Sequence, residues 1–281
     1  MIEKQEIIKL SQLWKLSPFT IEKDYVLGWI LIAIQSHPST SHTWIFKGGT
    51  CLKKCHFNLY RFSEDLDFTV TESTCLEEKK LKTCLIEIGE WVQNETGIEI
   101  PTDKISLDYH KNLSVQAKIP YLGPLKPQKR PLPNILLDLT VFEKIVLPPE
   151  KRYIYHPYSD KPQNAPLALC YPYEEIFAEK LRAFTERMRP RDLYDIIHLY
   201  QERLRLPIKA NKELILKILK EKCNFKNVPI PTWETTHNHP GLSSLPSQWE
   251  NMLAHQVSSL DSYEKFLETL PDLFSWLYEK E

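Results

Sequence analysis

The chain has 281 residues, of which 42% are hydrophobic and 26% charged, and its 36 Lys and Arg nearly balance its 37 Asp and Glu, for a formal net charge of −1. This composition is typical of a globular protein with one large or two modest domains, and it excludes disordered, collagen-like and disulfide-scaffold proteins. The near-zero charge also excludes a uniformly basic nucleic-acid-binding protein, so contact with nucleic acid requires a local basic patch.

The opening segment is predicted to form two helices that are separated at Ser17-Pro18. Apolar residues recur at helical spacing before this break, and Thr20 is suited to cap the second helix, which runs to about Ser36. The longest apolar stretch, Tyr25 to Ile34, has about half of the roughly 20 residues that a membrane span needs. It therefore predicts a buried helix and a cytoplasmic protein without a membrane partner.

A strand, a glycine turn and a helix are predicted next. Residues 43–46 are aromatic and β-branched, and Gly48-Gly49-Thr50 separates them from a helical pattern over residues 51–59. Residues 65–70 alternate between polar and apolar side chains, which indicates a half-buried strand. The elements predicted after them are a helix over residues 76–91 and strands over residues 104–107, 113–119 and 135–141.

The predicted secondary structure changes from mixed α/β to mainly helical near residue 150. A proline- and tyrosine-rich stretch, residues 147–173, precedes a part of the chain for which helices are predicted over residues 174–188, 191–203 and 209–223. We therefore expect two domains, an α/β domain with N-terminal helices over residues 1–150 and a mainly helical domain over residues 151–281. The fold class is α+β, with a mixed sheet flanked by helices and a helical C-terminal domain.

The six cysteines include no C-x-x-C pair, so reduced thiols are expected. Cys51 and Cys55 lie four residues apart and next to His56, and these are metal-ligating residue types. Because no second cluster in the sequence completes a tetrahedral site, the favoured interpretation is a pair of small thiols that face the core from one side of a helix.

Gly48 and Gly49 are adjacent where a strand passes into a helix, and Thr50 follows them. Glycine lets the backbone approach a phosphate closely, and the amides of the following helix are attractive to an anion. A triphosphate could therefore bind here. On the diglycine alone, a tight turn without a ligand is the favoured interpretation.

Three acidic residues are predicted to lie on strands. Asp65 and Asp67 are two residues apart and so point to the same face of their strand, where two anions repel unless a cation compensates them. Hard carboxylate oxygens at this spacing suit Mg²⁺. Asp138 lies within an apolar strand, where it either joins the other two acids at a metal or pairs with a buried Lys or Arg.

Four motifs in order resemble the AbiEii/AbiGii toxin family of bacterial nucleotidyltransferases, within the nucleotidyltransferase β-like superfamily. They are Glu22-Lys23-Asp24-Tyr25, the run from Phe46 to Lys54, the run from Arg61 to Asp67, and Arg191-Asp192-Leu193-Tyr194-Asp195. The resemblance extends from about Lys23 to Tyr200. It implies a nucleotidyltransferase-like sheet, and a helical domain that completes the active-site cleft.

The resemblance also implies roles for particular residues. Asp65, Asp67 and Asp138 would be catalytic and would bind Mg²⁺, with Mn²⁺ as the alternative ion, and an NTP would be the substrate. The residues that would bind the nucleotide in this first part of the chain are Gly48, Gly49, Thr50, Lys53 and Ser63.

The helical domain supplies Lys180, Asp192 and Asp195. Lys180 lies at the edge of the apolar side of its helix and needs an anion, for which a triphosphate, Asp192 and Asp195 are the candidates. The two acids are neighbours on one helix surface, and capping by Asp192 in the first helical turn explains much of that motif without chemistry. The resemblance places Lys180 among the catalytic and nucleotide-binding residues, with both acids at the nucleotide.

The function implied is transfer of a nucleoside monophosphate (NMP) from an NTP to the 3′ end of tRNA, by the toxin of a type IV toxin–antitoxin or abortive-infection system. The implied protein partner is a DNA-binding antitoxin. Local basic clusters that could contact RNA are Lys126, Lys129 and Arg130 in one loop and Arg187, Arg189 and Arg191 at a helix break. The alternatives are NMP transfer to a protein side chain, and a catalytically silent protein that binds nucleotide or a partner.

Overall fold

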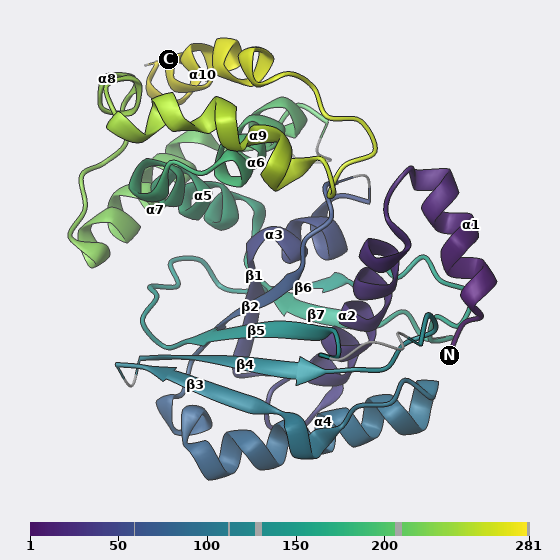
Figure 1. Cartoon of the computed structure of the whole chain (residues 1–281). Coiled ribbons are helices and arrows are strands. Elements are labelled where there is room, and N and C mark those ends of the chain that lie inside the picture. Colours follow the sequence, from purple (N-terminus) through teal and green to yellow (C-terminus); the bar gives the residue numbers. More distant parts are fainter. Residues whose placement is uncertain (59, 112, 127–130, 206–209, 280–281) are drawn as a thin grey trace. The chain divides into compact units, whose positions relative to one another are not determined.

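The structure is a computed structural model that describes residues 1–58, 60–111, 113–126, 131–205 and 210–279. Within these residues, seven strands form one mixed sheet in the order β3-β4-β5-β2-β1-β7-β6 (Figure 1). The pairs β1–β7 and β2–β5 are parallel, and the other neighbouring strands are antiparallel. The strands are β1 (Trp44–Lys47), β2 (Asp65–Val70), β3 (Ser106–His110), β4 (Ser114–Pro120), β5 (Asn134–Thr140), β6 (Glu150–Tyr153) and β7 (Leu167–Cys170).

Four helices accompany this sheet: α1 (Lys4–Trp14), α2 (Pro18–Ser36), α3 (Gly48–Cys51) and α4 (Glu78–Thr96). The first helix break is confirmed, but the predicted cap is wrong. Ser17 caps α2 by accepting a hydrogen bond from the backbone N–H of Phe19, because Pro18 already occupies the first helical position and leaves Thr20 inside the first turn. The buried α2 contacts α4, β2 and β7, as its apolar sequence predicts.

The chain divides into two compact units. Unit 1 comprises Met1–Phe142 and Pro149–Tyr171, and unit 2 comprises Glu143–Pro148 and Pro172–Glu281. Unit 1 therefore extends beyond residue 150, where the sequence places the change in secondary structure, because β6 and β7 return to the sheet. These strands have four residues each, which is too short to stand out in a stretch rich in proline.

Unit 2 is helical in its described residues. The segment Glu143–Pro148 is tied to it by Glu175, whose carboxylate accepts hydrogen bonds from the backbone N–H groups of Val146 and Leu147. Lys222 pairs with the same carboxylate at 2.9 Å. The helices are α5 (Tyr173–Arg187), α6 (Pro190–Glu202), α7 (Lys212–Lys226), α8 (Trp233–His237), α9 (Leu245–Leu253) and α10 (Tyr263–Tyr278).

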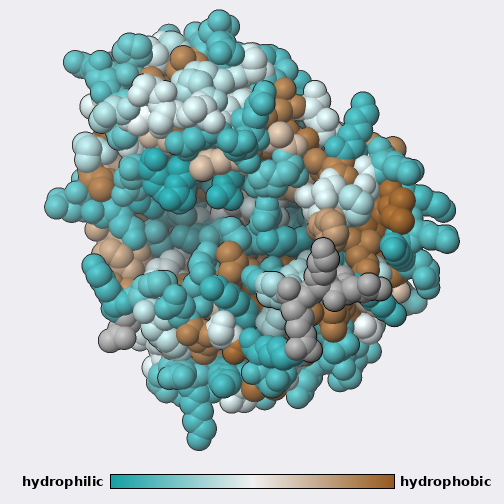
Figure 2. Space-filling view, viewed as in Figure 1, coloured by the Kyte–Doolittle hydropathy of each residue, from teal (hydrophilic) through white to brown (hydrophobic). Residues whose placement is uncertain are grey.

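The α+β prediction is confirmed, with a mixed sheet and a helical second part. The sheet core of unit 1 is aromatic, since the ring of Phe68 contacts those of Trp44 and Phe46 and all three residues are buried. Hydrophilic residues cover most of the face of the molecule shown in Figure 2, with small hydrophobic patches between them. Among the described residues, no helix combines the length and the apolar character that crossing a bilayer requires.

Candidate active site

The turn between β1 and α3 requires glycine for two reasons. Gly48 has φ +80, in the left-handed region, and a Cβ atom at this position would lie 2.1 Å from Oδ2 of Asp67. A Cβ atom on Gly49 would lie 2.8 Å from Nη2 of Arg61 and 3.1 Å from Oγ of Ser63. The diglycine thus lets an acid, a guanidinium and a hydroxyl approach the backbone at the end of β1.

The three predicted acids come together on neighbouring strands. β2 and β5 are parallel, and their register places Asp67 directly opposite Asp138. Asp65 lies two residues before Asp67 on the same face of β2, and all three side chains are half-buried. Carboxylates that face each other in this way repel, and a bound cation would offset that repulsion.

The hydrogen-bond partner of Asp138 bears on one of the two interpretations that the sequence left open, namely pairing with a buried Lys or Arg. Gln116 on β4 donates from Nε2 to Oδ1 of Asp138 at 3.0 Å, and the two residues are in register. The described polar partner of Asp138 is therefore a neutral amide and not a buried cation. Gln116 orients the carboxylate without neutralising it, which suits a role beside a metal.

Thr50 and Lys53 are less open than their predicted roles suggest. The Thr50 hydroxyl donates to the backbone oxygen of Asp65 at 2.5 Å, so it fastens α3 to β2. Lys53 is 5% exposed, and its Nζ lies 3.7 Å from the centroid of the Phe62 ring. Burial lowers the pKa of Lys53 to about 8, although the charge of Asp24 raises it. Their contact with phosphates stays a prediction.

Two basic residues near the turn were not singled out from the sequence. Lys47, the last residue of β1, is opposite Asp67 in the antiparallel β1–β2 pair, and its Nζ lies 5.9 Å from the centroid of the Tyr171 ring. Arg61 is buried against Gly49. Their positions beside the diglycine and before the Asp-Leu-Asp run are the only sequence signal for them, and a single basic residue is too common to assign from position alone.

A buried polar group lies behind the turn and was also missed. Nζ of Lys54 lies 2.7 Å from Oδ2 of Asp24, which also accepts a hydrogen bond from the Tyr158 hydroxyl at 2.8 Å. Burial raises the pKa of Asp24, but the positive charges of Lys54 and Lys53 and these hydrogen bonds outweigh it and lower the pKa overall. Asp24 belongs to the Glu-Lys-Asp-Tyr motif, and its partners come from distant parts of the sequence.

In unit 2, the predicted lysine contacts both predicted acids. Nζ of Lys180 on α5 lies 2.6 Å from Oδ2 of Asp195 and 4.0 Å from Oδ1 of Asp192 on α6. Arg187 donates to both oxygens of Asp192, at 3.1 Å from Nε and 2.6 Å from Nη2. Of the anions proposed for Lys180, the structure therefore supplies the two carboxylates.

The predicted site residues fall into one set in each unit. In unit 1, the diglycine, Ser63 and the three acids surround the end of β1, whereas Thr50 and Lys53 are turned into the fold. In unit 2, Lys180, Asp192 and Asp195 form one ion-pair cluster. Of the basic residues considered for RNA, Arg187 is paired with Asp192, and Lys129 and Arg130 lie outside the described residues.

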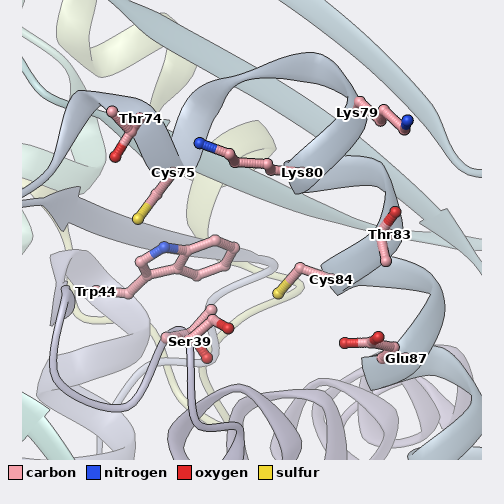
Figure 3. Close-up of a pocket in the computed structure, with 10 residues that line it drawn as sticks. Ser39, Trp44, Thr74, Cys75, Lys79, Lys80, Thr83, Cys84 and Glu87 are labelled. Carbon is pink, nitrogen blue, oxygen red and sulfur yellow. The ribbon is translucent and has the colours of Figure 1, made fainter.

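A cavity of about 430 Å³ in unit 1 is separate from these residues. Figure 3 shows the Trp44 ring between Cys75 and the side chains of α4, with Cys84 beside the ring and Lys79 pointing away from it. The cavity is lined by none of the predicted site residues. We therefore do not assign the chemistry of the acids to it.

A strand that turns through a diglycine into a helix, beside a strand with two acids and a parallel strand with a third, is the arrangement that the sequence resemblance to nucleotidyltransferases leads us to expect. Residues 29–279 match the family model described as nucleotidyl transferase AbiEii toxin, type IV TA system, and the chain belongs to this family. The protein is thus a toxin-family nucleotidyltransferase, with an NTP substrate, a divalent metal as the family's usual cofactor and an antitoxin partner.

Solved structures share the fold at low sequence identity. MenT4, a nucleotidyltransferase toxin from Mycobacterium tuberculosis H37Rv, is 17% identical with a TM-score of 0.70, over 100% of this chain and 91% of that chain. A putative nucleotidyltransferase from H. pylori is 17% identical with a TM-score of 0.57, over 95% and 100%. JHP933 from Helicobacter pylori is 18% identical with a TM-score of 0.55, over 93% and 94%. No curated protein matches the chain.

Proposed function

We propose that this protein is a Mg²⁺-dependent enzyme that transfers NMP from an NTP to the 3′ end of tRNA. The observation that carries the proposal is the register of β2 and β5, which sets Asp67 opposite Asp138 with Asp65 on the same face. Three carboxylates with hard oxygen atoms fit Mg²⁺ better than they fit a softer ion. A protein whose site had decayed would be expected to lack at least one of these three carboxylates.

The residues of unit 1 bind the metal and the triphosphate. Asp65 and Asp67 hold the metal, and the close backbone approach at Gly48 and Gly49 accommodates the triphosphate. When bound, Mg²⁺ neutralises charge on the triphosphate and on the departing pyrophosphate. Ser63, whose hydroxyl lies against Gly49, donates to a phosphate oxygen.

Asp138 acts as the base. Its Oδ1 accepts the hydrogen bond from Gln116, so Oδ2 takes the proton of the attacking hydroxyl. The hydroxyl oxygen forms a bond to the α-phosphorus, the bond from that phosphorus to the bridging oxygen breaks, and pyrophosphate leaves. The NMP remains on the acceptor.

In unit 2, Lys180 is the nucleotide-binding lysine, and Asp195 and Asp192 orient it. The 2.6 Å contact with Asp195 fixes the direction of a flexible side chain. An oriented lysine side chain is suited to contact with a triphosphate oxygen. The proposed protein partner is a DNA-binding antitoxin, as the resemblance implies.

The test uses the full chain with Mg²⁺, total bacterial tRNA and each of four α-labelled NTPs, followed by separation of RNA and protein on a denaturing gel. The variants are Asp65→Asn and, as the matched control, Asp108→Asn on the exposed face of β3. We expect label on RNA with one NTP, retained in Asp108→Asn and lost in Asp65→Asn.

The other outcomes separate the alternatives. Label on polypeptide would show that the acceptor is a protein side chain and not tRNA. Equal labelling by Asp65→Asn and the wild type would contradict the site assignment. No label with any NTP, while the protein still binds NTP, would favour a silent binding protein.

A further inference from the structure

Three cysteines and a histidine from two separate segments meet in unit 1. Cys51 ends α3, Cys55 and His56 belong to the π-helical turn Leu52–His56, and Cys170 ends β7. The sulfurs of Cys51 and Cys170 and a ring nitrogen of His56 lie within 4.8 Å of one another. The sulfur of Cys55 is close enough to those of Cys51 and Cys170 to hydrogen-bond to them. The sequence interpretation named Cys51 and Cys55 as core thiols. It did not include Cys170, which the structure places beside them.

The backbone explains why these residues meet. β7 pairs in parallel with β1, with Cys170 opposite Phe46, so Cys170 reaches the end of the sheet where α3 begins. In the turn that follows α3, the N–H of Phe57 bonds to the carbonyl of Leu52, five residues earlier. This wider repeat brings His56 to the same side as Cys51, and such π-helical turns are frequent at functional sites.

We propose that Cys51, Cys55, His56 and Cys170 form a structural Zn²⁺ site. Three thiolates and one imidazole are an established tetrahedral zinc ligand set, in which the sulfur atoms lie about 3.8 Å apart. Cys51, His56 and Cys170 already lie within 4.8 Å of one another, so these three need only a small adjustment to reach a metal-bound geometry, and Cys55 has to move closer to complete the set.

The surroundings of His56 and Cys55 fit this assignment. Nε2 of His56 lies 3.2 Å from the backbone oxygen of Tyr171, which can only accept, and metal-ligating histidines characteristically donate their other ring N–H to such an oxygen. A Zn²⁺ ion with three thiolates has a net charge of −1, and Nη1 of Arg152 lies 3.4 Å from the backbone oxygen of Cys55. The guanidinium can thus offset the charge of the site.

The burial of the cluster favours a structural role. Cys51 and Cys170 are fully buried, whereas Cys55 and His56 are half-buried, so an ion can enter from that side. All four ligand positions are filled by side chains, which leaves none for a substrate. The ion would clamp β7 to the segment just after the diglycine turn, and it would be distinct from the Mg²⁺ held by the acids.

The site is tested by metal analysis of the untagged full chain purified from zinc-supplemented cells. We expect about one Zn²⁺ per chain in the wild type, loss of that ion in Cys170→Ser and His56→Gln, and retention in Cys223→Ser. Cys223 is a matched control because it is also a fully buried free cysteine, and it lies on α7 in unit 2.

A second measurement needs no folded variant. Wild-type protein stripped of zinc and loaded with Co²⁺ should show the sulfur-to-cobalt charge-transfer band and the intense visible bands of a tetrahedral thiolate site. Substoichiometric zinc together with the absence of these bands would overturn the proposal. A disulfide between Cys51 and Cys170 in freshly purified protein, found by peptide mass, would also overturn it.

Discussion

In unit 1, Asp67 and Asp138 face each other across the β2–β5 pair, whereas in unit 2, Asp192 and Asp195 each lie against a basic side chain. Two facing carboxylates repel each other, whereas a buried carboxylate beside a basic side chain attracts it, and removing one partner of such a pair leaves a charge that is poorly compensated. Replacement of acids that look equivalent in the sequence is therefore expected to change different properties of the protein. Loss of an acid in unit 1 should affect activity, and loss of an acid in unit 2 should also affect stability.

The largest expected effect is on the activity of Asp67→Asn. Replacing one of the facing carboxylates removes a metal ligand and should lower the rate of NMP transfer on the order of 1000-fold, which corresponds to about 4 kcal/mol of transition-state stabilisation. The same change also removes the repulsion between Asp67 and Asp138, so the melting temperature without metal should change less than it does in Asp195→Asn. A fall in thermal stability as large as that of Asp195→Asn would contradict the comparison.

The next effect is on the stability of unit 2. Asp195 is fully buried beside Lys180, and Asp195→Asn should lower the free energy of unfolding by roughly 3 kcal/mol because it leaves Lys180 with only the longer, 4.0 Å contact to Asp192. The double variant Lys180→Met with Asp195→Asn should recover part of this loss. Denaturant unfolding measures both.

The matched control is the exposed pair Lys265–Asp261 on the same unit, at 2.8 Å. Asp261→Asn should cost no more than about 0.5 kcal/mol, because solvent screens this pair. If Asp195→Asn were equally mild, the ion pair of Lys180 would not be what holds α5 to α6.

A smaller effect on stability is expected from alanine substitutions at Gly48 and Gly97. Comparing the two separates the cost of backbone strain from the cost of displacing Asp67. Gly48 and Gly97 both have positive φ, at +80 and +75, but a Cβ atom on Gly97 would meet only Met1, at 3.9 Å. Gly97→Ala should thus cost about 1 kcal/mol of backbone strain. Gly48→Ala should cost more, at least about 2 kcal/mol, and should lower activity at least about 10-fold, since the new methyl group displaces Asp67. Equal unfolding energies and an unchanged rate would show that Asp67 does not need Gly48.

The last effect depends on pH, and it tests the buried group around Asp24. Burial, together with the positive charge of Lys54, lowers the pKa of His156 to about 3 from its ordinary 6.5. As the pH falls below 6.5, the unfolded chain binds a proton at this position and the folded chain does not, so the free energy of unfolding should decrease.

This slope is measured by denaturant unfolding between pH 6.5 and 3.8, above the range in which Asp24 titrates. His156→Gln should flatten it, and His42→Gln, at an exposed position, should not. Parallel slopes in all three proteins would mean that His156 is protonated in the folded state.

The sequence located the residues of the acidic site but could not establish their contacts. The diglycine, the alternation over residues 65–70 and the apolar strand around Asp138 are local patterns, and local patterns predict strands and turns well. The pairing of Asp67 with Asp138 depends on which strand lies next to β2, and β5 begins more than sixty residues later in the chain. The sequence therefore left two interpretations for Asp138, and only the structure shows that the amide of Gln116 is hydrogen-bonded to its carboxylate.

By itself, the sequence determined the α+β class, the helix break at Ser17-Pro18 and the two sets of candidate residues, because periodicity and turn chemistry act over a few residues. The tertiary structure decided that β6 and β7 join the sheet, that Lys53 is turned into the fold, and that Cys170 meets Cys51. Each of these depends on side chains far apart in the chain, whose approach is fixed by strand order and packing. No local pattern records that information.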